Sequence, residues 1–209
     1  MRRLFAVDPS LTCSGWALFC GGGGELLAVG KIRAKGPSIP MANRLKDLQE
    51  KVRGVFDTIG LDGNDVLVCE APTTMRDPRA ALVVEQVRGI FESVARELGT
   101  RVPGRINPRS VQYELMGLKG KQLKREIVKQ VAHDVAERLF GEKLTRLGLP
   151  LGASKGKHQD IVDAVLLGAY GFSKITHAEK VGEPWENFFS QNEPRKRSAA
   201  RLGVLGSSS

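Results

Sequence analysis

Short apolar runs near the N-terminus predict three β-strands in succession. They cover residues 4–8, 15–20 and 26–32, and four consecutive glycines separate the second run from the third. Apolar runs of this length around a glycine-rich break are typical of a hairpin. The first run ends at Asp8 and Pro9, and proline is excluded from the interior of a central strand. The pattern therefore predicts a meander of three strands at the start of the chain.

The rest of the chain alternates between helical and strand-like patterns. Where apolar side chains recur every three or four residues, one face of an amphipathic helix is indicated. The predicted elements are, in order, a helix at 40–58, a strand at 66–70, a helix at 80–98, a short strand at 105–107, and helices at 123–140 and 160–172. This order predicts an α/β fold in which helices pack on a mixed sheet.

Composition narrows the class of protein. The 209 residues are 41% hydrophobic and 26% charged, which predicts one compact domain at 1–175 and a largely flexible, basic extension at 176–209. No apolar run approaches the roughly 18 residues that span a bilayer, and the N-terminus lacks the apolar core of a signal peptide. The three cysteines lack paired spacing, which argues against a disulfide scaffold or a zinc ribbon. We therefore expect a cytoplasmic protein with no membrane segment.

The positive charge is concentrated in one segment. Residues 101–146 contain eleven Lys and Arg against five Asp and Glu, within a chain whose net charge is +9. The densest part holds Lys119, Lys121, Lys124, Arg125 and Lys129. A phosphate backbone is the natural partner of such a patch, although a solvated helix face has the same composition.

Four carboxylates stand where predicted elements begin or end. Asp8 ends the first strand, Glu70 ends the fourth, and Asp160 and Asp163 lie three residues apart at the start of the last helix. If the two strands are parallel neighbours, Asp8 and Glu70 leave the same edge of the sheet about 5 Å apart. Residues at i and i+3 share one helix face. Glu70 and Asp163 also interrupt apolar runs, and a buried carboxylate needs a partner.

This constellation favours a divalent metal site and a nuclease. Carboxylates that share a cavity repel one another, and Mg²⁺ or Mn²⁺ prefers their oxygens. Two ions could polarise a phosphodiester, ionise a water and stabilise the leaving oxygen. Taken singly, Asp8 could be a turn residue and Asp160 a helix N-terminal residue. His158 is a further candidate, as a helix cap, a metal ligand, an acid or base, or an exposed loop residue.

Three motifs resemble the RuvC family of Holliday junction resolvases. LFAVDPSLTCSGWALF, from residue 4, is similar to the family's first strand and turn, with Ser10 in place of a glycine. EAPTTMRDPRAALVVEQVRG, from residue 70, ends in a similar Gln-x-Arg-Gly signature, and HQDIVDAVLLGAYG, from residue 158, resembles the closing Asp-x-x-Asp-Ala helix. The resemblance covers about residues 3–173. It implies a ribonuclease H-like fold, a mixed five-stranded sheet flanked by helices.

The resemblance also implies an activity, cutting four-way DNA junctions as a homodimer with two Mg²⁺ ions, or Mn²⁺, in each site. The implied metal ligands and catalytic residues are Asp8, Glu70, Asp160 and Asp163, with Lys124 and His158 as further catalytic candidates. The implied DNA-binding residues are Lys119, Lys121, Lys124, Arg125, Arg76 and Thr73. The helix at 80–98 would carry much of the dimer contact.

Thr73 is the main departure from the family pattern, because family members often have an aromatic residue there that stacks at the junction centre. One alternative is therefore a nuclease of broader range, acting on other branched DNA, on flaps, or as a ribonuclease H. An alternative of another class is a non-catalytic DNA-binding module or an actin-like ATPase-type domain. The latter requires paired phosphate loops across two domains, for which 209 residues are too few.

Overall fold

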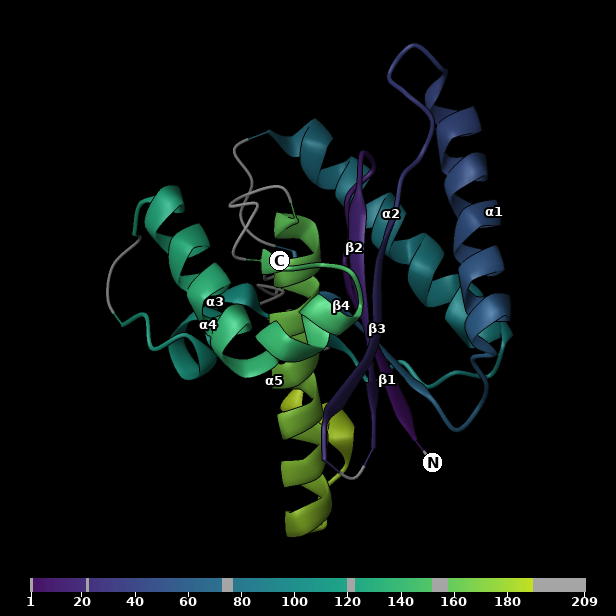
Figure 1. The fold of residues 1–209 in the computed structure, drawn as a ribbon. Coiled ribbons are helices and arrows are strands. Elements are labelled where there is room, and N and C mark those ends of the chain that lie inside the picture. The colour runs from purple at the N-terminus through teal and green to yellow at the C-terminus, as the bar shows by residue number, and fades with distance from the viewer. Residues whose placement is uncertain (1, 22, 73–76, 120–122, 152–157, 190–209) are drawn as a thin grey trace, which may run out of the picture.

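A mixed sheet of five strands forms the centre of the molecule (Figure 1). The computed structural model describes residues 2–21, 23–72, 77–119, 123–151 and 158–189. Within them the strands are β1 Arg3–Asp8, β2 Ser14–Cys20, β3 Glu25–Ile32, β4 Val66–Glu70 and β5 Arg105–Ile106, in the order β3-β2-β1-β4-β5. The β1–β2 and β2–β3 pairs are antiparallel, whereas β1–β4 and β4–β5 are parallel. The predicted meander and mixed sheet are therefore confirmed.

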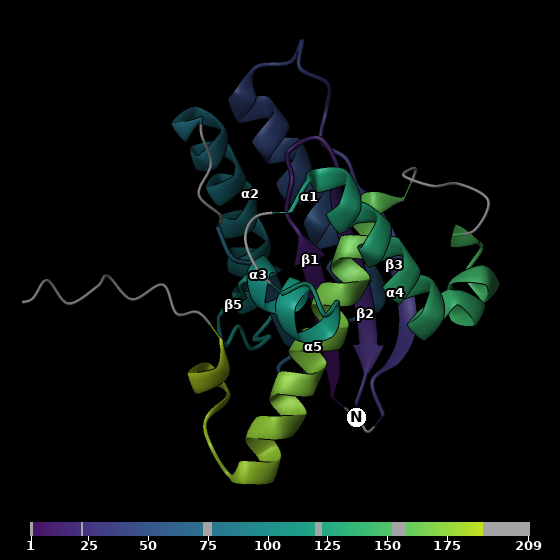
Figure 2. The same cartoon turned by 90° about the vertical axis from the view of Figure 1, so that its left-hand side faces the viewer.

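Helices cover both faces of this sheet. On one face lie α1 Met41–Ile59 and α2 Pro78–Glu97, and on the other lie α4 Arg125–Arg146 and α5 Gln159–Val181 (Figures 1 and 2). The short α3 Pro108–Ser110 continues into a π-helix, η1 Val111–Leu115, and a 3₁₀ turn, η3 Trp185–Phe188, follows α5. Within the ranges described above, no helix is both long enough and apolar enough to cross a bilayer.

Burial on both faces explains why the central strands are continuous apolar runs. In β1, Leu4 and Ala6 belong to the core shared with α4 and α5, whereas Phe5 and Val7 belong to the core shared with α1 and α2. Alternate side chains of a strand point to opposite faces. In a strand that is covered on both sides, every side chain is therefore buried, and apolar residues are favoured at each position. The polar residues Asp8 and Glu70 therefore appear only where β1 and β4 end.

Two helices extend beyond their predicted ends. The helix expected at 123–140 runs from Arg125 to Arg146, and the one expected at 160–172 runs from Gln159 to Val181. Buried side chains continue along each helix, at Leu144 in α4 and at Ile175 and Ala178 in α5. The helical spacing of apolar residues, and with it the helix, continues beyond the residues where apolar side chains are densest.

The domain boundary expected between residues 175 and 176 falls inside α5, so the segment that follows belongs to the folded body. Trp185 and Phe189 are buried in the core between the sheet and α5. The Trp185 ring lies between the guanidinium groups of Arg2 and Arg101, at 4.2 and 3.8 Å from the ring centre. The rest of the predicted extension, residues 190–209, lies outside the described residues.

Gly168 lets α5 lie directly against the sheet. A Cβ atom at this position would stand 2.2 Å from an aromatic carbon of Phe19 in β2 and 3.1 Å from the Cβ of Ala6 in β1. Both neighbours are fully buried, and the closely packed core around them prevents them from moving away. The glycine therefore sets the distance between α5 and the sheet.

We predict that Gly168→Ala destabilises the protein, because overpacking a filled core typically costs about 1–3 kcal/mol. Gly54→Ala is the matched control, because Gly54 also lies in a helix but faces open space. Alanine favours helix over glycine, so this variant should be unchanged or up to about 1 kcal/mol more stable. Urea denaturation measures both free energies of unfolding. Equal effects at the two positions would contradict the close packing of α5.

Candidate active site

One row of residues across the sheet carries the predicted acids of β1 and β4. Asp8 is paired with Gly15 of β2, and Gly15 is paired with Lys31 of β3. Asp8 and Glu70 each follow the last registered pair of their two parallel strands. Paired residues project to the same face of a sheet, so Asp8, Glu70 and Lys31 all point toward the layer of α4 and α5.

The start of α5 brings the other two acids to this row. Gln159 is the first residue of the helix, and Asp160 and Asp163 follow on one face of its first turns. The helix backbone approaches so closely that a Cβ at Gly15 would lie 1.8 Å from the carbonyl oxygen of Asp160. The glycine in the middle of the row therefore makes room for the end of α5.

All four predicted carboxylates line one cavity of about 600 Å³. Its walls come from the ends of β1 and β4, from α2, from α3 and η1, and from α4 and α5. The structure thus brings Asp8, Glu70, Asp160 and Asp163 together from three distant parts of the sequence. Their role as metal ligands stays a prediction.

Burial and neighbouring negative charges raise the pKa values of Asp8, Glu70 and Asp163. Burial, followed by the charges of Glu70, Asp163 and Asp160, raises the pKa of Asp8 well above its usual range. Burial and the Asp163 charge raise the pKa of Glu70 to about 7, and burial is the main cause that raises the pKa of Asp163 to about 6. The hydrogen bond between Asp8 and Glu70 further raises the pKa of Asp8, and it lowers the pKa of Glu70 against the effect of burial.

Two of the acids also contact neutral or cationic side chains. The Lys31 ammonium lies 3.1 Å from Asp160 Oδ2, and Gln159 Nε2 donates to Asp163 Oδ1 at 2.8 Å. As the side chains are placed, no three His, Cys, Asp or Glu groups within the described ranges lie close enough together to hold one ion. The donors nevertheless fit a hard divalent cation in kind, because all are carboxylate oxygens in a cavity where they repel one another.

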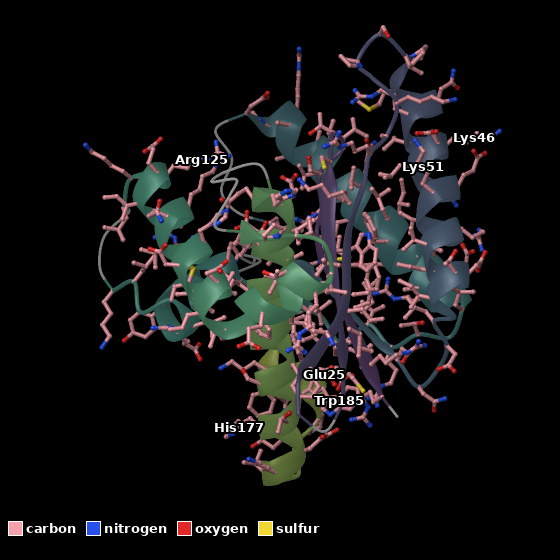
Figure 3. All side chains as sticks on the ribbon, in the orientation of Figure 1. Glu25, Lys46, Lys51, Arg125, His177 and Trp185 are labelled. Atoms are coloured by element: carbon pink, nitrogen blue, oxygen red, sulfur yellow. The ribbon has the colours of Figure 1, made fainter. Side chains whose placement is uncertain are left out.

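The basic wall of the cavity comes from α4. Arg125 and Lys129 line it, together with Val128 and Ala132, and these four positions form one stripe along the helix. The positive charges of Lys129 and Arg125 lower the pKa of Asp163 against the effect of burial. Figure 3 shows Arg125 at the start of α4, at the end of the molecule where α5 begins.

The predicted DNA-binding residues divide into three groups. Arg125 lines the cavity, whereas Lys119 and Lys124 lie outside its lining, Lys124 directly before α4 and Lys119 over the ring of Tyr113. The remaining three, Lys121, Arg76 and Thr73, lie outside the described residues. His158 directly precedes α5, where its carbonyl oxygen accepts the first helix hydrogen bonds; its side chain makes no capping bond and is not part of the cavity lining.

Sequence reasoning did not place two of the side chains, Lys129 and Arg88, in the cavity. Lys129 belongs to the predicted basic segment, but only its spacing of four from Arg125 on a helix indicates that both face the same way. Arg88 of α2 is 1% exposed, and its Nε donates to the carbonyl oxygen of Glu70 at 2.6 Å. It also pairs with Glu85. Arg88 therefore fixes the end of β4, from which the Glu70 side chain projects.

Comparison with solved structures identifies the fold as that of the RuvC-type resolvases, within the ribonuclease H-like class. Thermus thermophilus RuvC in complex with a Holliday junction substrate matches with a TM-score of 0.59 and 16% identity, over 87% of this chain and 97% of that one. Thermus thermophilus RuvC in a further structure matches with a TM-score of 0.58 and 18% identity, over 86% and 96%.

The fowlpox virus resolvase in complex with substrate Holliday junction DNA matches with a TM-score of 0.53 and 17% identity, over 83% of this chain and 98% of that one. No family model and no curated protein matches the sequence. At such identities the likeness establishes the fold, and the fold predicted from the three motifs is therefore confirmed.

We predict that Asp8→Asn stabilises the metal-free protein at high pH. A carboxyl group whose pKa is higher in the folded state binds more protons when folded, so the free energy of unfolding falls as pH rises. For Glu70 this window runs from about 4.5 to about 7. Removing the Asp8 charge should make the free energy of unfolding fall less as the pH rises. The melting temperature at pH 8 should therefore rise, by about 2–4 °C for each kcal/mol of added stability.

Asp47→Asn is the control of opposite sign, because a hydrogen bond from Lys51 lowers the pKa of Asp47. That variant should lose stability at pH 8. Differential scanning calorimetry at pH 5 and pH 8 in the presence of a chelator measures both. A loss of stability in Asp8→Asn at pH 8 would show that the acids do not repel one another.

Proposed function

We propose that this protein is an Mg²⁺- or Mn²⁺-dependent endonuclease that makes paired nicks in four-way DNA junctions. The observation that carries the proposal is the cavity in which four carboxylates from three separate segments face Arg125 and Lys129. Carboxylates that repel one another are stabilised by bound cations, and the Arg and Lys side chains beside them would bind a phosphate group. The fold is one in which solved relatives are resolvases bound to Holliday junctions.

In this proposal Asp8, Glu70, Asp160 and Asp163 hold two ions, which would polarise the phosphodiester and lower the pKa of the attacking water. The protein's own groups carry out the remaining tasks. Burial raises the pKa values of Asp8 and Glu70 and so favours their protonated forms, and these groups would give up protons on binding a cation. Arg125 and Lys129 hold the phosphate that is cut.

The proposed DNA path continues outside the cavity. Lys124 directly precedes Arg125, and Lys119 lies over the ring of Tyr113 in η1, an element that lines the cavity; both lysines would contact flanking phosphates. Lys121, Arg76 and Thr73 are proposed contacts from the sequence alone. Lys124 and His158 stay as proposed catalytic candidates on the resemblance.

A symmetric substrate suits a protein that acts as a homodimer. The proposed contact surface is the outer face of α2 with the neighbouring part of α1. Leu82 of α2 is 67% exposed, and a groove between the two helices is lined by Leu45, Lys46 and Ile90. Lys46 is seen on the outside of α1 in Figure 3. Burying this face against a second copy would place two cavities on one junction.

A nicking assay on a synthetic four-way junction tests the proposal. Wild-type protein should make paired nicks across the branch point with Mg²⁺ or Mn²⁺ and none with a chelator. Asp8→Asn and Glu70→Gln should abolish cleavage while junction binding persists, because the phosphate contacts come from other residues. Glu25→Gln should cut normally, because Glu25 lies at the opposite end of the sheet (Figure 3).

The same assay separates the alternatives. Equal cutting of three-way junctions or flaps would favour the broader nuclease that Thr73 suggests, and cutting of the RNA strand in a hybrid would favour a ribonuclease H. Full cleavage by Asp8→Asn in Mg²⁺, or no cleavage of any substrate by wild-type protein, would overturn the proposal.

We predict that Lys129→Met weakens junction binding at every sequence tested. Losing one phosphate contact should reduce the slope of log affinity against log salt by about 1. Lys143→Met is the matched control, because it removes the same charge from α4 at its far end, where Lys143 pairs with Glu25. Fluorescence anisotropy at several salt concentrations measures both. Identical slopes for the two variants would remove Lys129 from the proposed interface.

A further inference from the structure

One of the four clustered acids already has a cationic partner from the sheet. Lys31 of β3 places its ammonium 3.1 Å from Asp160 Oδ2. The lysine side chain is 17% exposed and that of Asp160, which lines the cavity, is 37% exposed, so the pair lies beside the cavity with the lysine as the more buried partner. The two residues are 129 positions apart in the sequence.

The row across the sheet explains this contact. Lys31 and Asp8 flank Gly15 in the same row, and both project toward α5. Neighbouring strands are about 4.8 Å apart, so Lys31 stands about 10 Å from Asp8 on the far side of the bare glycine. The start of α5 occupies the space above Gly15. Asp160 is thus approached by a carboxylate from one side and by an ammonium from the other.

The Lys31 contact has a consequence for cation binding. An ammonium and a divalent cation that share one carboxylate repel each other. Within the described residues, no three of the acids lie close enough together to hold one cation. Asp160 is the one of the four acids that pairs with a lysine. Release of Asp160 by Lys31 would make a fourth carboxylate available to a cation.

We propose that Lys31 is a positioning residue that competes with divalent cation for Asp160, so that the cation position at Asp160 fills only at higher cation concentration. The inference rests on the proposed function, because it concerns the same metal site. It predicts that the site binds one cation more tightly than a second one in the absence of DNA. A substrate phosphate would then help to load the weaker position.

Mn²⁺ binding to the full chain without DNA tests this inference. Isothermal titration calorimetry, together with the electron paramagnetic resonance signal of free Mn²⁺, gives the affinities of wild type, Lys31→Met and Lys143→Met. Lys31→Met should bind the weaker Mn²⁺ about tenfold more tightly, because it removes the positive charge that pairs with Asp160 and repels the cation. Lys143→Met removes the same charge from the remote pair with Glu25 and should match wild type.

Two further variants separate competition from a general charge effect. Lys31→Arg keeps the positive charge and should bind Mn²⁺ as wild type does. In an Asp160→Asn background, Lys31→Met should have little effect, because the carboxylate for which the cations compete is gone. Circular dichroism and the melting temperature establish that each variant is folded, and Lys31→Gln replaces Lys31→Met if the latter is not.

The outcomes are distinguishable from those of the nuclease proposal. Mn²⁺ binding by wild type with unchanged or weaker binding by Lys31→Met would overturn the competition and leave the metal site standing. The absence of Mn²⁺ binding in every variant would overturn both.

Discussion

Mutual repulsion among carboxylates is the constraint on which the candidate active site depends. Asp8, Glu70 and Asp163 lie where burial and neighbouring negative charges raise their pKa values. Folding must bring these groups together against that repulsion, and the favourable free energy has to come from the two apolar layers on either side of the sheet. The cavity therefore holds unfavourable electrostatic energy, which a bound cation would release.

The positive charges around the cavity come from two directions. Lys31 approaches from the sheet and is paired with Asp160, whereas Arg125 and Lys129 approach from α4 and face the cavity. Lys31 balances a negative charge of the protein itself. Arg125 and Lys129 lie where they would contact a bound phosphate. Gly15 makes the arrangement possible, because a side chain there would collide with the start of α5.

The sheet and the four acids were predictable because both depend on local pattern. A strand buried on both faces is a continuous apolar run, and an acid at its end, such as Glu70, stands out against that run. Asp163 stands out for the same reason within α5. Lys31 was not predictable, because its partner is brought near only by the pairing of β2 with β3 and the approach of α5 to Gly15.

The burial of residues after 175 was not predictable for a related reason. Aromatic residues such as Trp185 are too sparse after α5 to form a periodic pattern, and their burial depends on Arg2 and Arg101 from elsewhere in the chain. Arg88 is the arginine of the Gln-x-Arg-Gly signature, but its role at the end of β4 follows from its contact with a backbone carbonyl oxygen, which the signature alone does not predict.

The stacking of Trp185 between Arg2 and Arg101 ties the segment after α5 to the start of β1 and to the segment that leads into β5. This contact lies at the end of the sheet opposite to the acids, as the positions of Trp185 and Arg125 in Figure 3 show. The strands β1 and β4 thus begin beside the Trp185 contacts and end at the cavity. A ligand of the acids consequently meets the sheet at the ends of β1 and β4, in the space lined by α2, η1 and α4.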